Sequence, residues 1–189
     1  MKKYIALLGV GLGGLFWTQC SPPDDDYINW STIELEVKNA LKIENKENYI
    51  VGDTLFFALN FSRYLPEEGQ STDLDVYETS GVNKFTYGFG MLKYSSFSDS
   101  YQSVSIDEKY LLSEKGSVNY AGQVFTILNS DTNMYESRIG IILVEEGEYQ
   151  LDFSYLTLYS DYNPDKPSIG IEHIITEDQP LVLNFTVSK

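Results

Sequence analysis

The alternation of apolar and polar residues is the feature of this sequence that most limits its possible folds. Between residues 54 and 61 every second residue is large and apolar, namely Leu55, Phe57, Leu59 and Phe61. A period of two is typical of a β-strand with one buried face. The same period returns at 33–37 and 149–155, and turn residues separate many short segments of this kind. With almost no helical pattern beside them, these segments predict an all-β protein, an antiparallel β-sandwich.

The order of these segments also predicts hairpins and loops. Two hairpins are expected, residues 74–79 with 84–92 and residues 135–144 with 148–159. Gly88 and Gly90 fall on one face of their segment, which favours a bulge or the close approach of another backbone. The serine-rich segment 94–103 is interpreted as a loop. Residues 107–115 are interpreted as either a short helix or a strand.

Composition divides the chain into three parts. Residues 1–19 are a predicted signal peptide, residues 20–31 a flexible acidic tether, and residues 32–189 a single β-sandwich domain with a long insertion. About 170 residues after the signal suit one domain. With 15 Tyr and 10 Phe, the chain is too apolar for disorder, and aromatic side chains suit a pleated, half-buried surface.

The first twenty residues have the order of a secretory signal. Lys2 and Lys3 precede an apolar run from Tyr4 to Trp17, and the only cysteine, Cys20, follows it closely. The run is shorter than the ~20 residues that a transmembrane helix needs. A secreted chain with one cysteine has no internal disulfide to form. Cys20 is therefore a lipid attachment site, an intermolecular bridge or a thiol in a discarded peptide, and its position at the end of the apolar run favours lipid.

This stretch resembles bacterial lipoprotein signals, in which the cysteine becomes the acylated first residue of the mature chain. Trp17 and Gln19 stand where the common lipobox has Leu and a small residue, and this looser pattern is similar to lipoproteins of the Bacteroidota. In that group an acidic stretch after the cysteine resembles the signal for export to the outer face of the outer membrane. Residues 21–26 contain three aspartates, so the resemblance implies an outward-facing, lipid-anchored outer-membrane protein. Alternatively, the aspartates belong to a solvated linker.

The net charge of the chain indicates which kinds of partner it can bind. The chain has 13 Lys and Arg against 28 Asp and Glu, and a mature chain without Lys2 and Lys3 has 11 against 28, a net charge of −17. Such a surface repels nucleic acid, which excludes nucleic-acid binding. It also repels anionic lipid head groups, so we expect contact with the membrane only through the N-terminal lipid. An envelope protein or a glycan is a possible partner, although acidity also serves solubility alone.

One segment resembles a known fold family. Residues 145–151, Glu-Glu-Gly-Glu-Tyr-Gln-Leu, resemble the tyrosine corner of immunoglobulin-like sandwiches, where a tyrosine hydroxyl bonds to a nearby backbone group. The resemblance implies this structural role for Tyr149, and an immunoglobulin-like form of the sandwich. Neither tryptophan lies in the middle of the domain, which departs from the antibody pattern. Alternatively, Gly147 serves an ordinary hairpin and Tyr149 is a core residue.

One loop has the spacing of a calcium site. Positions one, three, five and twelve of the calcium-loop pattern are filled by Asp161, Asn163, Asp165 and Glu172. Lys166 stands where that pattern needs glycine, and strands rather than helices are expected on both sides. Two interpretations stay open, calcium binding by these four residues or a plain exposed loop. No other cofactor is expected.

Patterns of catalytic residues are scarce. The only histidine, His173, lies on a short apolar segment, where a packed histidine is more common than a catalytic one. No Gly-x-Ser-x-Gly turn or zinc spacing occurs, and glycines resembling a phosphate loop lie only in the signal. A pair of carboxylates of the glycosidase type stays open. Four tyrosines in or beside expected loops either stack on sugars or pack against the sandwich edge: Tyr94, Tyr101, Tyr159 and Tyr162.

These features together predict a lipid-anchored envelope protein that acts without enzymatic chemistry, as a binding or structural module. The alternative from another class is a glycan-degrading hydrolase or its accessory glycan-binding protein. A groove with two facing carboxylates and exposed rings would indicate that alternative. A third option is a subunit of an outer-membrane complex, which a large exposed apolar patch would mark.

Overall fold

The apolar alternation forms strands throughout the part of the chain that the structure describes. The computed structural model describes residues 32–175 and 180–189, and of these 57% are in strands and 5% in helices. The prediction of an all-β sandwich is therefore confirmed. The predicted signal peptide, Cys20 and the tether lie outside the described residues.

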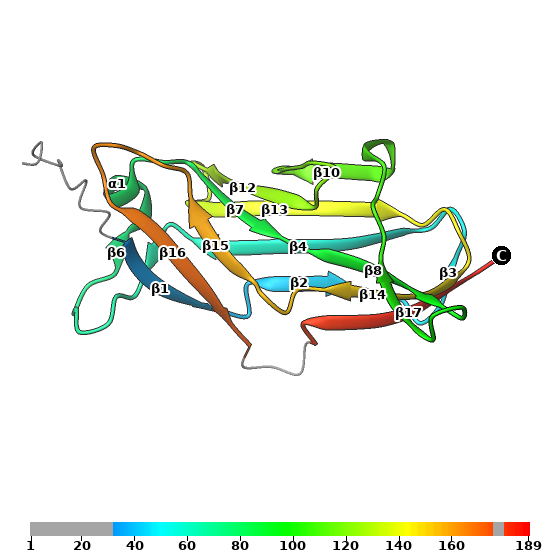
Figure 1. The fold of residues 1–189 in the computed structure, drawn as a ribbon. Helices are drawn as coiled ribbons and strands as arrows, with labels where there is room; N and C mark the ends of the chain where they lie inside the picture. The colour runs from blue at the N-terminus through cyan, green and yellow to red at the C-terminus, as the bar shows by residue number, and fades with distance from the viewer. Residues whose placement is uncertain (1–31, 176–179) are drawn as a thin grey trace, which may run out of the picture.

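The larger of the two main sheets has ten strands. Eight lie side by side in the order β1 (Thr32–Lys38), β16 (Ser168–Ile174), β15 (Thr157–Ser160), β7 (Lys84–Gly88), β12 (Gln123–Asn129), β13 (Met134–Ile142), β4 (Thr54–Ser62) and β2 (Leu41–Glu44) (Figure 1). Two shorter strands, β10 (Leu111–Lys115) and β11 (Ser117–Val118), pair with β13 and β12 respectively.

The smaller main sheet has five strands. Their order is β3 (Tyr49–Ile50), β17 (Val182–Ser188), β14 (Gly147–Asp152), β8 (Gly90–Ser95) and β9 (Ser100–Ser103). Most strand pairs in both sheets are antiparallel, as expected. Two are parallel, β1 with β16 and β3 with β17. In both cases the partners are far apart in the sequence, so no short turn forces an antiparallel direction.

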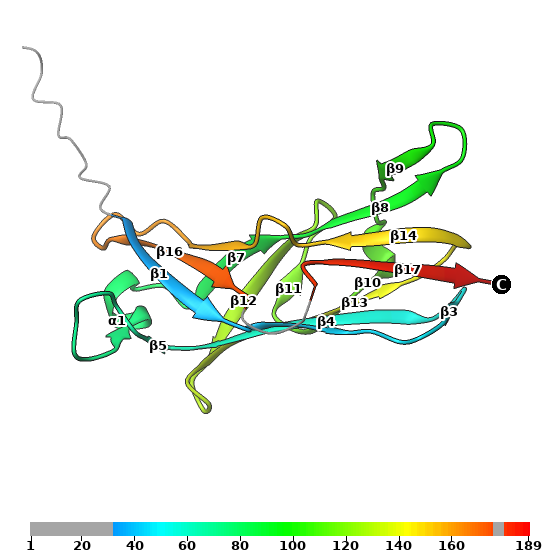
Figure 2. The same ribbon diagram turned by 90° about the horizontal axis from the view of Figure 1, so that it is seen from below.

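The two sheets pack face to face through large apolar side chains, and Figure 2 shows β8, β14 and β17 above β4 and β13. Leu55, Phe57 and Leu59 of β4 are fully buried. The ring of Phe57 meets those of Phe89 and Phe153 edge to face, at centroid distances of 5.0 and 5.1 Å. Because each fully buried Leu or Phe stabilises a fold by about 1.5–3 kcal/mol, β4 supplies much of the energy that joins the sheets.

The chain changes sheet between β13 and β14. β13 pairs with β4 over nine residues of the larger sheet, whereas β14 pairs with β17 and β8 in the smaller one. The predicted hairpin of residues 135–144 with 148–159 is therefore wrong. Both strands alternate with a period of two, and this period reveals which face of a strand is buried but not which sheet the strand joins.

A second change of sheet occurs at Phe89, between β7 and β8. The backbone N–H of Phe89 donates to the carbonyl of Gly122 at 3.1 Å. A Cβ at Gly122 would lie 2.8 Å from the carbonyl oxygen of Phe89. The close approach of another backbone, expected here from Gly88 and Gly90, is thus present, and the segment 84–92 is two strands in two sheets.

Part of the chain between β4 and β7 forms a small separate unit. It contains the paired strands β5 (Tyr64–Leu65) and β6 (Leu74–Asp75), followed by the helix α1 (Val76–Ser80). The strand predicted for residues 74–79 is present only at 74–75, and residues 76–79 belong to the helix. The side chain of Asp75 accepts a hydrogen bond from the backbone N–H of Glu78 at 3.1 Å and caps the helix, and Gly81, with φ of 66°, ends it.

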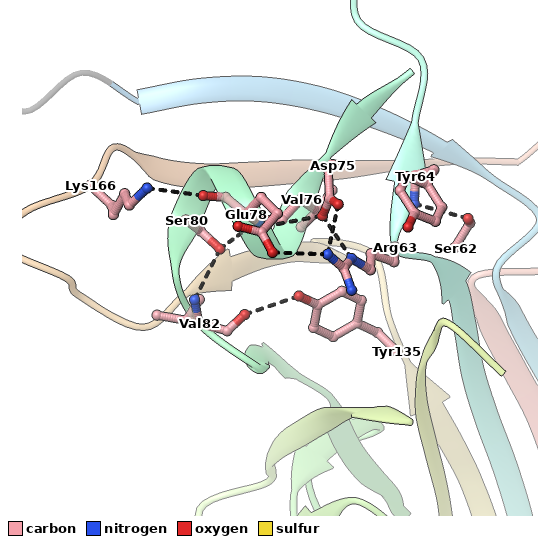
Figure 3. Close-up of polar contacts among 10 residues, drawn as sticks. All are labelled: Ser62, Arg63, Tyr64, Asp75, Val76, Glu78, Ser80, Val82, Tyr135 and Lys166. Carbon is pink, nitrogen blue, oxygen red and sulfur yellow. Dashed lines mark hydrogen bonds and ion pairs between the residues drawn. The ribbon is translucent and has the colours of Figure 1, made fainter. Parts of the chain in front are cut away.

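Arg63 fastens this unit to the end of β4 (Figure 3). Its guanidinium donates two hydrogen bonds of 2.7 Å to the carboxylate of Asp75. It also lies over the rings of Tyr64 and Tyr77, 5.5 and 5.0 Å from their centroids. The hydrogen bond from Arg63 lowers the pKa of Asp75. A five-residue helix is unstable alone, so this paired and stacked guanidinium holds the cap of α1 in place.

The chain between residues 94 and 115 has more regular structure than expected. β8 and β9 form a hairpin where a loop was predicted, and Figure 2 shows this hairpin projecting beyond the sandwich. Residues 107–115 divide into a 3-10 turn, η1 (Glu108–Tyr110), and the strand β10. Each of the two interpretations of that segment therefore holds for one part of it.

The buried side chains of both sheets belong to one hydrophobic cluster. In the ranges 32–175 and 180–189, no helix has the length and apolar sequence needed to cross a membrane.

Gly116 and Gly69 test how tightly the sandwich is packed, because both have positive φ, 68° and 79°. A Cβ at Gly116 would collide with the carbonyl oxygen of Phe125 and lie 3.1 Å from the Cβ of Ser137, whereas Gly69 has open space around it. We expect Gly69→Ala to cost about 1 kcal/mol from backbone strain, and Gly116→Ala about 2–4 kcal/mol because crowding adds to that strain. Urea unfolding measures both costs, and equal costs would contradict the packing described.

Candidate binding pocket

A mostly apolar pocket of about 370 Å³ opens between the two sheets, close to the point where β13 gives way to β14. Its apolar wall comes from β8, the end of β13 and the segment between β9 and β10, through Met91, Val104, Ile106, Tyr110, Ile141, Leu143 and Val144. Met91, Ile141 and Leu143 are buried core residues. The floor of the pocket is thus the hydrophobic core itself.

A short segment, residues 104–106, forms one side of the pocket, and we call it the strap. It connects β9 to the segment before η1. The backbone N–H of Val104 donates to the carbonyl of Met91 at 2.9 Å. Val104, Ser105 and Ile106 also line a second hollow, of about 130 Å³. The strap is therefore bordered by open space on two sides, and its two apolar side chains are only partly buried.

Each charged group that lines the pocket has an oppositely charged partner. The ammonium of Lys93 lies 2.8 Å from the carboxylate of Glu145 and 5.3 Å from the ring centroid of Tyr149. The hydrogen bond between them raises the pKa of Lys93 and lowers that of Glu145, so both are charged at neutral pH. Asp107 is paired with Lys109 at 2.8 Å. Each of these two pairs is therefore electrically neutral.

Tyr149 joins the pocket to the passage between the sheets. Its hydroxyl donates to the backbone carbonyl of Glu145 at 3.0 Å, so the hydrogen bond expected from the sequence is present. Its ring stacks on that of Phe185 of β17 at a centroid distance of 5.5 Å. The side chain therefore ties the linker between β13 and β14 to the smaller sheet.

The four residues with calcium-loop spacing do not converge. The carboxylate of Asp161 pairs with Lys84 at 2.8 Å. The amide of Asn163 donates to the carbonyl of Ser80 at 3.1 Å, and its oxygen accepts the backbone N–H of Asp165 at 3.0 Å. No three His, Cys, Asp or Glu side chains within the described ranges are grouped so that they could hold a metal ion. Calcium binding stays a prediction without support from this geometry.

Glu172, the fourth of these residues, lines a different hollow of about 760 Å³ between β1 and the residues that follow β5. Five of its ten lining residues are glutamates: Glu34, Glu36, Glu67, Glu68 and Glu172. This hollow is larger than the pocket but strongly acidic, so it disfavours apolar and anionic molecules.

His173 is a packed residue of β16, only 9% exposed. Its Nε2 accepts the backbone N–H of Leu41 at 3.1 Å, so the neutral ring carries its proton on Nδ1. Nδ1 is buried and has no hydrogen-bond partner among the described residues. Burial lowers the pKa of His173. His173 therefore has a structural role, because it accepts the hydrogen bond from the first residue of β2.

The tyrosines proposed to stack on sugars occupy separate places. Tyr94 and Tyr101 lie on the hairpin of β8 and β9 and pack edge to face at 5.6 Å. Tyr159 lies on β15, and Tyr162 in the loop that follows it. Both are more than half exposed.

Tyr155 is a further exposed tyrosine, although the period of two over residues 149–155 placed it on a buried face. It is 95% exposed and borders a shallow hollow of about 310 Å³, which Gly88, Gly90 and Asp152 also line. The missing side chains of the two glycines leave this surface open.

Comparisons of the chain with models of protein families, with characterised proteins and with solved structures gave no match.

Replacing the hydroxyl of Tyr149 tests its structural role. We expect Tyr149→Phe to lower the free energy of unfolding by about 0.5–1.5 kcal/mol, because one intramolecular hydrogen bond is lost. Tyr155→Phe is the matched control, since its side chain is almost wholly in solvent, and we expect no measurable change. Urea unfolding of the two variants decides, and equal effects would mean that the bond to Glu145 does not stabilise the fold.

The burial of His173 makes stability depend on pH. The unfolded chain takes up a proton on this ring near its usual pKa of about 6.5, whereas the folded chain resists it. The stability from a neutral His173 is therefore fully present above pH 6.5 and is lost as the pH falls, by at most about 1.4 kcal/mol per pH unit. We expect His173→Gln to lose less stability than the unaltered chain between pH 7.5 and 5.5 in urea unfolding. Equal losses would contradict this assignment.

Proposed function

We propose that this chain is a lipid-anchored protein of the cell envelope that works without enzymatic chemistry, as a binding module, with the pocket beside the strap as its binding site. The observation that carries the proposal is an apolar pocket with a few polar groups at its edge, the usual composition of a small-molecule site. Lipid attachment at Cys20 follows from the sequence resemblance.

The positions of the two ends of the domain suit such an arrangement. β1 begins at Thr32, at one end of the sandwich, and the passage from β13 to β14 lies at the opposite end (Figures 1 and 2). A tether that enters at Thr32 therefore leaves the pocket on the side away from the membrane. The acidic residues 21–26 support export to the outer face of the outer membrane, and the net charge keeps the body of the protein off anionic lipid.

The strand order supports an immunoglobulin-like form of the sandwich. β2, β4, β13 and β12 follow one another as strands A, B, E and D do in that family, and β8, β14 and β17 as strands C, F and G do. β14, the counterpart of strand F, carries Tyr149. The remaining strands of the larger sheet then extend that core as an elaboration.

An accessory glycan-binding role is the second candidate. Its support is the exposed Tyr155, beside the hollow over Gly88 and Gly90. Leu156 and Leu158 are buried, so Tyr159 of β15 also faces solvent. Exposed rings beside an open backbone suit stacking on sugar rings. A loss of glycan binding on Tyr155→Ala, with Val144→Asp at the pocket as control, would favour this role.

Lipid attachment is tested by metabolic labelling with a fatty acid. We expect the unaltered chain and Ser21→Ala to incorporate label and Cys20→Ala to remain unlabelled, because acylation needs the thiol. Label retained by Cys20→Ala would overturn the anchor.

Protease added to intact cells tests the outward orientation. We expect cleavage of the labelled chain without permeabilisation. Protection on intact cells, with cleavage after permeabilisation, would place the protein inside the envelope.

A further inference from the structure

The lining of the pocket beside the strap identifies the class of ligand that it takes. We propose that this pocket binds a small, uncharged, mostly hydrocarbon molecule, an inference that rests on the proposed binding function and goes beyond it. Nine of its thirteen lining residues are aliphatic or aromatic, and Met91, Ile141 and Leu143 at its floor belong to the core. A volume of about 370 Å³ lies at the small end of the range for ligand pockets.

The pairing of charges explains why the ligand is uncharged. An anion would have to compete with Glu145 for Lys93, whose ammonium lies 2.8 Å from that carboxylate. It would also approach a chain with a net charge of −15. A cation would find both nearby carboxylates engaged, Glu145 by Lys93 and Asp107 by Lys109. Both pairs lie at the exposed edge of the pocket, so a charged ligand that replaced one partner would gain little over the pair that it breaks. Its charge would also lose water against the apolar floor.

Lys93 still provides a polar contact at the edge of the pocket. An ammonium group has three N–H donors. One is used by Glu145, and the ammonium as a whole lies over the ring of Tyr149. A hydroxyl or carbonyl oxygen at one end of the ligand can accept a remaining donor while the hydrocarbon part lies against the floor.

The packing around the strap also supports a bound ligand in this pocket. Its side chains Val104 and Ile106 are only partly buried, and hollows border it on two sides. A core that needed no ligand would be expected to fill such spaces, because protein interiors are close-packed. The larger hollow beside β1 also has buried apolar residues in its lining, but five glutamates surround them, so it suits an apolar molecule less well.

Two fluorescent probes with one skeleton test the class of ligand. N-phenyl-1-naphthylamine is uncharged, and 8-anilino-1-naphthalenesulfonate is the same hydrocarbon with an anionic sulfonate. We expect the uncharged probe to bind at least about tenfold more tightly at low salt. The protein is the full chain carrying Cys20→Ala, so that no acyl chain of its own competes for the probe.

A pair of matched variants assigns the binding to this pocket. Val144 at its edge is 43% exposed and Ile127 on β12, outside the pocket, is 42% exposed. We expect Val144→Asp to weaken binding of the uncharged probe by at least about fivefold, because a carboxylate disfavours an apolar ligand, and Ile127→Asp to change it by less than about twofold. Ile106→Asp in the strap is the second variant, and circular dichroism checks that each variant is folded.

The outcomes separate the ligand class from the site. If the anionic probe binds as tightly as the uncharged one and Lys93→Met abolishes this, the pocket takes anions and only the ligand class is overturned. If neither probe binds, or if Val144→Asp and Ile127→Asp behave alike, the pocket is not a binding site and the binding function proposed for it falls as well. Fatty-acid labelling at Cys20 is independent of all these results.

Discussion

The burial of alternate side chains of β4 against the smaller sheet is the interaction on which the rest of the structure depends. Phe57 lies at the centre of this contact, edge to face with Phe89 and Phe153. Since β4 pairs with β13 along nine residues, the same contact fixes β13. The chain that leaves β13 must then cross to the smaller sheet within residues 143–146. That crossing brings Glu145 to Lys93 and sets Leu143 in the floor of the pocket.

The sequence predicts the strands well because burial on one face leaves a period of two in the chain. The resemblance of residues 145–151 to a tyrosine corner also implied the hydrogen bond of Tyr149, and that bond is local, to a backbone group only four residues away. It did not predict which sheet β14 joins, because that choice depends on contacts with β17 and β8, which are distant in sequence. The helix α1 was missed although Asp75 and Gly81 are ordinary cap residues. Its five residues are too few to show a helical period.

The candidate site could not be predicted from the sequence, for a related reason. Its walls come from three separate segments, and an apolar residue such as Ile141 looks the same whether it lines a pocket or fills a core. The available signal was the alternation of Val104 and Ile106 directly after the serine-rich segment 94–103. Calcium binding at residues 161–172 stays a prediction. The structure adds that Asn163 holds its loop against α1 through the carbonyl of Ser80, a contact that spacing along the chain does not encode.

The parallel pairing of β1 with β16 over seven residues determines how the domain bears mechanical load. A pull on Thr32 acts along the axis of β1 and runs across the hydrogen bonds of the ladder, so the bonds share the force in shear instead of opening one after another. Because β16 pairs with β15, and β15 with β7, in the same sheet, tension at this end is spread over several strands. A protein held by its N-terminal end would therefore resist drag without distorting the opposite end of the sandwich.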